Sequence, residues 1–110
     1  MNKSSLISFG AHTVDHVSLT SVSKKEAKNQ IINSIGSLSS KINENVKLFS
    51  YPEGQKEDFD KSIINILKSI KINHCPTAIH GVNNFKKADP YYLKRIMVGF
   101  SKFKYPFKIN

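Results

Sequence analysis

Two histidines, His12 and His16, stand four positions apart directly after an apolar run near the start of the chain. Neutral imidazole is the commonest protein ligand for divalent transition metals. A catalytic zinc typically takes three protein ligands and keeps one position for water. The spacing therefore predicts two ligands of a metal site, and a third ligand has to come from elsewhere.

The composition predicts one small domain. The chain has 110 residues, 39% of them hydrophobic, enough for a modest core that buries roughly 65% of the unfolded surface. No window approaches the roughly 18 apolar residues that a membrane span requires, and the first residues lack the apolar core of a secretory signal, so the compartment stays unknown. The single cysteine, Cys75, excludes an internal disulfide and a thiolate metal cage, and we expect a small, buried or half-buried side chain that is unreactive.

The net charge of +9 raises the possibility of a polyanion partner such as nucleic acid. The lysines occur in small groups scattered along the chain, and only Arg95 among the 17 basic residues is an arginine. Bidentate readout of bases and phosphates favours arginine. A lysine-rich solvated surface is thus the favoured interpretation, and a basic nucleic-acid-binding module is kept as an alternative.

The histidine pair is expected to lie in a loop between a strand and a helix. The apolar run 6–9 ends at Gly10 and predicts a buried strand that delivers His12 to its carboxyl end. The sequence Ser23-Lys24-Lys25-Glu26 fits a capping box. Apolar residues then recur at steps of three or four, which predicts a helix over residues 24–42.

The rest of the chain continues the alternation of strands and helices. In chain order we expect a strand over 46–51, a turn at 52–54, a helix over 59–70, a weaker strand over 72–79, a loop over 81–90 and a last strand over 92–98. This order predicts an α/β fold of parallel βαβ units. Both helices are apolar on one side and few strands are available to cover them, so the pattern is typical of part of a larger layered domain.

Two stretches of the chain resemble the polysaccharide deacetylases of the NodB-homology class. They are HTVDHVSLT at residues 12–20 and LFSYPEG at residues 48–54, which are similar to the second and third motifs of that family. The resemblance extends over roughly residues 6–98. It implies a distorted (β/α) barrel, present here in part with the order βαβαβ, and a metal-dependent removal of N- or O-acetyl groups from a polysaccharide or amino sugar.

The resemblance also assigns roles to particular residues. In the family, one aspartate and two histidines hold a divalent metal, usually zinc, and the matching histidines are His12 and His16. Thr13 matches a hydroxyl residue that steadies the ligand loop by hydrogen bonding. The segment Pro52-Glu53-Gly54 matches a turn whose backbone amide binds the oxyanion, so the Glu53 N–H is the corresponding donor.

Several parts of the family pattern are missing from the chain. The aspartate ligand and the catalytic base belong to an upstream Asp-Asp motif that nothing here matches, and no tryptophan or Leu-x-His segment is present. Ser50 replaces an arginine that orients the base, and Glu53 replaces an aromatic residue. We therefore expect residues 1–110 to form a single partial domain without its N-terminal strands, with weak or no zinc binding and activity unless a missing N-terminal half joins it.

The remaining candidate ligands have weaker claims. Asp15 could bind a metal directly, or it could accept a hydrogen bond from the ring nitrogen of a ligand histidine. Direct binding is disfavoured because adjacent ligands on one loop strain a tetrahedral site. We expect His74 and His80 to be exposed and the aspartates at 58, 60 and 89 to act as caps or solvated charges. Two alternatives to a carbohydrate deacetylase stay open: a non-enzymatic binding remnant of the same fold, and the basic polyanion-binding module.

Overall fold

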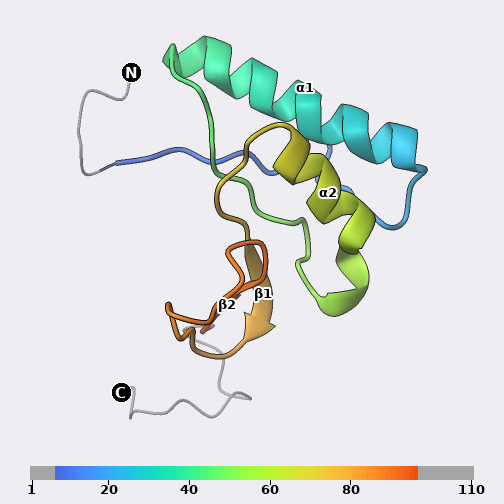
Figure 1. The fold of residues 1–110 in the computed structure, drawn as a ribbon. Coiled ribbons are helices and arrows are strands. Elements are labelled where there is room, and N and C mark those ends of the chain that lie inside the picture. The colour runs from blue at the N-terminus through green and yellow to red at the C-terminus, as the bar shows by residue number, and fades with distance from the viewer. Residues whose placement is uncertain (1–6, 97–110) are drawn as a thin grey trace, which may run out of the picture.

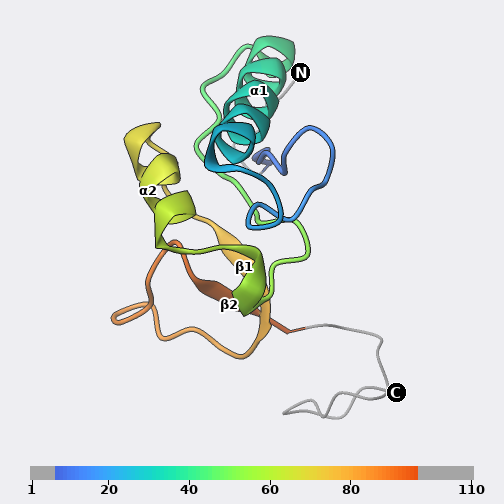
Figure 2. The ribbon, with the colours of Figure 1, turned by 90° about the vertical axis from the view of Figure 1, so that its right-hand side faces the viewer.

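The computed structural model describes residues 7–96. Its elements are the helices α1 (Lys24–Ile42) and α2 (Lys61–Ser69), a short 3-10 helix at Lys56–Asp58, and the strands β1 (Pro76–His80) and β2 (Leu93–Arg95). Figure 1 shows α1 along one side of the molecule, α2 beside it, and the two strands on the far side from α1. Figure 2, turned by a quarter, shows the blue N-terminal segment and the following loop lying below α1.

Helix α1 begins and ends where its local signals predict. The Ser23 hydroxyl accepts a hydrogen bond from the Glu26 N–H at 3.1 Å, and Asn43 closes the helix in the left-handed conformation. The Glu26 side chain does not reach back to the cap as the capping box predicts. The Glu26 carboxylate accepts instead from Gln30 Nε2 at 3.1 Å. Of the two hydrogen bonds of a capping box, this helix has the one accepted by the Ser23 hydroxyl.

The extended segments pair in parallel, one after another along the chain. Ala11 bridges Phe49, Leu48 bridges His74, and β1 pairs with β2 in an irregular register. Of the strand expected at 6–9, the described positions 7–9 form neither strand nor bridge, and the first bridge lies further along at Ala11. The strand expected at 46–51 is reduced to isolated bridges at Leu48 and Phe49. The ladder stops after residue 50 because the Ser50 carbonyl accepts from a histidine ring and because Pro52 has no N–H to donate.

Later elements follow the predicted order with shifted limits. Helix α2 is shorter than the predicted 59–70, and Asp60 caps it. Strand β1 begins at Pro76, a position that needs no N–H for the ladder. The last strand is limited to Leu93–Arg95, while positions 97–98 of the prediction and the basic segment 101–110 lie outside the described residues. The described residues form an α/β arrangement with parallel pairing, and they contain no closed barrel.

The core lies between the two helices and the paired segments. Tyr51 and Phe59 stack with ring centroids 4.1 Å apart and planes within 9°, and the Tyr51 hydroxyl donates to the Tyr91 carbonyl at 2.6 Å. Burial raises the pKa of the Tyr51 hydroxyl, and it raises the pKa of the fully buried Cys75 thiol to about 12. Cys75 is therefore an unreactive packing residue, as expected. None of the helices within residues 7–96 has the length and apolarity to cross a bilayer.

Asp60 gives the fold a testable pH dependence. Its Oδ1 accepts from the Ser62 hydroxyl at 2.5 Å and from the Ile63 N–H at 3.0 Å, and these hydrogen bonds hold the pKa of the carboxyl below its usual range. A carboxyl with a lowered folded-state pKa contributes stability above its unfolded pKa, and that contribution is lost as the pH falls through the folded pKa.

We expect Asp60→Ala to lower the unfolding free energy at neutral pH by about 1 kcal/mol, the usual cost of losing a cap. Asp60→Asn keeps a good capping residue without the charge. Its stability should stay near wild type at neutral pH and fall less on acidification. Urea unfolding at neutral pH and at about pH 3 measures both effects, and an Asp60→Ala variant as stable as wild type at neutral pH would refute the assignment.

Candidate functional site

Backbone pairing brings the histidine loop against the segment that follows Phe49. The Ala11 N–H donates to the Leu48 carbonyl at 2.9 Å, and the Ser50 N–H donates to the Ala11 carbonyl at 3.0 Å. Because the paired segments are parallel, the residues after Ala11 and those after Phe49 leave the sheet at the same edge. The two matched motifs therefore meet in space, as their positions at the ends of parallel strands predict.

The two imidazoles of this loop lie in contact. The ring centroids of His12 and His16 are 4.7 Å apart with an interplanar angle of 64°. His12 Nδ1 lies 2.8 Å from the Ser50 carbonyl oxygen and 2.8 Å from the Ser50 hydroxyl oxygen. A carbonyl oxygen only accepts, so His12 Nδ1–H is the donor and the ring keeps its Nε2 lone pair for another partner.

The turn at residues 52–54 faces the second histidine. Glu53 Oε1 lies 4.0 Å from His16 Nδ1, and both side chains are more than half exposed. The Gly54 N–H donates to the Pro52 carbonyl at 2.7 Å, and none of the hydrogen bonds found within residues 7–96 uses the Glu53 N–H. Gly54 has a φ of +74°, and a Cβ there would lie 2.6 Å from the Ala78 backbone nitrogen. Glycine at 54 thus lets the turn pack against β1.

Left-handed backbone conformations gather at this site. Thr13, His16 and Glu53 have φ values of 67°, 54° and 63°, and they are three of the five non-glycine residues in the described chain with positive φ. Such conformations are unfavourable for L-residues and cluster at functional sites. The Oγ1 of Thr13, the residue expected to steady the loop by hydrogen bonding, is buried and has no hydrogen-bond partner within the described residues.

An open pocket of about 320 Å³ adjoins this loop on the side of α1. His12 and Thr13 line it from the loop, and Ser34, Ser37 and Lys41 line it from the helix. The residue with the unpartnered hydroxyl, Thr13, therefore borders an open pocket. A buried hydroxyl without a partner usually marks a place where another polar group or a water approaches.

Gln30 of α1 holds the loop in place, and sequence reasoning missed it. Its Oε1 accepts from the N–H groups of Val14 and Asp15 at 3.0 and 2.9 Å. Its Nε2 donates to Asp15 Oδ2 at 2.7 Å and to Glu26 Oε1 at 3.1 Å. Only 6% of Gln30 is exposed. The signal in the sequence was that this polar residue stands between positions 27 and 31 of the apolar stripe, on the side of the helix that faces the core.

A second tie fixes the far end of the loop. The Ser18 hydroxyl donates to Asp58 Oδ1 at 2.7 Å, and the Thr20 hydroxyl donates to the Glu57 carbonyl. Asp58 is 8% exposed and also accepts from the Gln55 N–H at 3.0 Å. It is a local cap, as expected, and it additionally joins the loop to the segment after the turn.

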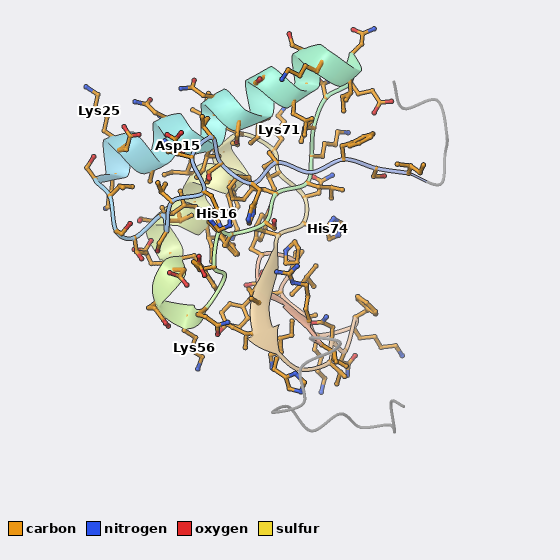
Figure 3. The ribbon with its side chains drawn as sticks, turned by 180° about the vertical axis from the view of Figure 1, so that it is seen from behind. Asp15, His16, Lys25, Lys56, Lys71 and His74 are labelled. Atoms are coloured by element: carbon orange, nitrogen blue, oxygen red, sulfur yellow. The ribbon has the colours of Figure 1, made fainter. Side chains whose placement is uncertain are left out.

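The other candidate ligands lie outside the site or face away from it. Asp15 contacts Gln30 beside α1, whereas His16 lies farther from that helix (Figure 3). His74 is exposed and lies apart from His16 in the same view, and His80 is exposed on β1. Within residues 7–96 no three side chains of His, Cys, Asp or Glu type are placed to hold a metal ion together. In this part of the chain the contacting pair His12 and His16 stands without a third side chain of these types placed to join it in holding a metal ion.

Comparisons with known proteins agree with the motifs. Residues 1–75 match a family model described as polysaccharide deacetylase. The fold is similar to that of a solved Streptococcus pyogenes deacetylase, PplD, in complex with acetate, with a TM-score of 0.72 and 24% identity. The match covers 81% of this chain and 38% of that one. No curated protein sequence is significantly similar to the chain.

The contribution of Gln30 can be measured directly. Gln30→Ala leaves two loop N–H groups without their acceptor, so we expect the unfolding free energy to fall by about 1–3 kcal/mol. Amide hydrogen exchange at Val14 and Asp15 should accelerate. Asn33→Ala, an exposed position on the same helix, serves as the control. Unchanged exchange at both amides in Gln30→Ala would show that Gln30 does not hold the loop.

Proposed function

The chain belongs to the polysaccharide deacetylase family, and from this membership we propose that the histidine loop is part of a site that removes acetyl groups from a carbohydrate. The observation that carries the proposal is the pair of touching imidazoles, with His12 oriented through Nδ1 by Ser50. A metal-ligating histidine typically donates its other ring N–H to a carbonyl or carboxylate. His12 has this arrangement, with Nδ1–H donating to the Ser50 carbonyl.

The donor set fits two positions of a divalent metal such as zinc. His12 and His16 would hold the ion, and the cation would lower the pKa of a bound water and polarise the acetyl carbonyl. All eight acidic residues of the sequence lie within the described residues, and none completes a three-ligand group there. We propose that the third ligand and the base are carboxylates from outside these 110 residues.

The Thr13 hydroxyl supports this view of an incomplete site. It is buried, it has no partner within residues 7–96, and it adjoins the histidine whose Nε2 is available. A polar group arriving from another segment would satisfy it. The chain also spans only 38% of the solved deacetylase that it resembles. Closure of the parallel segments into a (β/α) barrel, with the missing strands supplied from elsewhere, belongs to the same proposal.

The turn after Phe49 supplies the chain's own part of the chemistry. Hydrolysis of an acetamide passes through a tetrahedral oxyanion, consumes one water, and releases acetate and an amine. The Glu53 N–H, unused in the hydrogen bonds of the described residues, would donate to that oxyanion. Pro52 and Gly54 fix the direction of this N–H, because the proline ring limits φ before it and the glycine admits the positive φ after it.

Metal binding tests the proposal. With two protein ligands, we expect the chain to bind zinc weakly and to lose that binding in His12→Ala and in His16→Ala. His74→Ala is the control, because it removes an exposed imidazole that lies apart from the pair. Calorimetric titration with zinc, after removal of any affinity tag, gives the three affinities. Equal affinities in all three variants, or no zinc binding by the wild type, would contradict the proposed ligands.

A further inference from the structure

We propose that Glu53 is a positioning residue for His16, a role for its side chain that is separate from the oxyanion role of its backbone. The Glu53 carboxylate would accept from His16 Nδ1–H and so leave His16 Nε2 available to a cation. This inference rests on the proposed metal site. It deepens that site by naming the group that orients its second imidazole.

The short segment from Ser50 to Glu53 faces both imidazoles, and in each ring the atom that it approaches is Nδ1. Ser50 contacts Nδ1 of His12 at 2.8 Å, and Glu53 lies 4.0 Å from Nδ1 of His16. The two partners are three residues apart, and the two histidines are four apart on the opposing loop. With the rings 4.7 Å apart, Ser50 and Glu53 at the two ends of this segment each face one of the two imidazoles.

The backbone directs the Glu53 side chain to this place. Glu53 and His16 both have left-handed φ values, 63° and 54°. Because φ sets the direction of the Cα–Cβ bond relative to the chain, an extended Glu53 would send its carboxylate elsewhere. The neighbouring Gly54 is packed against β1 and ties the turn to the sheet. The approach of these two side chains is thus built into the turn and the loop.

The chemistry of imidazole explains why the contact matters when a cation binds. At 4.0 Å, with both side chains more than half exposed, the pair is an electrostatic contact longer than a hydrogen bond. Such a pair is weak in the free protein. An imidazole that coordinates through Nε2 becomes a stronger Nδ1–H donor, so its attraction to the carboxylate grows in the loaded site.

The test removes the carboxylate charge of Glu53 without changing the shape of its side chain. Glu53→Gln keeps the length and branching of the side chain, and Glu57→Gln removes the same charge at an exposed position four residues further on. We expect Glu53→Gln to weaken zinc binding by about three- to tenfold, less than for a buried partner because the pair is exposed. Glu57→Gln should bind zinc as the wild type does. High salt should narrow the difference between the two variants.

A second readout needs no metal. Imidazole ¹⁵N chemical shifts at mildly alkaline pH, where imidazoles are neutral, report which ring nitrogen carries the proton. In Glu53→Gln the Nδ1–H form of His16 should become less populated, while His12, held by Ser50, should not change. An unchanged His16 spectrum, or equal losses of affinity in Glu53→Gln and Glu57→Gln, would overturn the inference.

The two readouts separate this inference from the function on which it rests. If the wild-type chain binds no zinc but Glu53→Gln shifts the His16 tautomer, the proposed metal site is refuted and the orienting contact is supported. Zinc binding that depends on both histidines but not on Glu53 would support the site and overturn the role of Glu53.

Discussion

The site depends on one interaction, the parallel pairing of Ala11 with the segment around Phe49. Two backbone hydrogen bonds, from Ala11 to Leu48 and from Ser50 to Ala11, place the histidine loop beside the turn that follows residue 51. Without this pairing the Ser50 carbonyl could not accept from His12, and Glu53 could not approach His16. A short β-bridge thus positions the histidine loop, where most sheets would use a longer ladder. Because the bridge is short, the loop needs additional support.

That support comes from buried polar side chains at both ends of the loop. Gln30 satisfies the N–H groups of Val14 and Asp15, and Asp58 receives the Ser18 hydroxyl. Burying such groups is favourable only when their hydrogen bonds are made, so each contact restricts where the loop can go. The imidazoles between these anchors are held partly oriented, which lowers the entropic cost of binding a ligand.

Local signals in the sequence predicted part of this arrangement. The Ser23 cap and the apolar stripe gave the limits of α1, and Pro52 with Gly54 marked the turn, because these residues act on the backbone next to them. The extended segments shrank to bridges because pairing depends on partners distant in the chain. Gln30 was missed because a glutamine in a helix ordinarily faces water, and its burial is decided by the loop that folds over it.

The central claim is that His12 and His16 bind the same metal ion through their rings. X-ray absorption spectroscopy of the zinc-loaded chain tests it directly, because the fine structure reports the number and type of ligand atoms. We expect two imidazole nitrogens at about 2.0–2.1 Å from the zinc, with oxygen atoms in the remaining positions. A spectrum without imidazole scattering, or with only one imidazole per zinc, would contradict it.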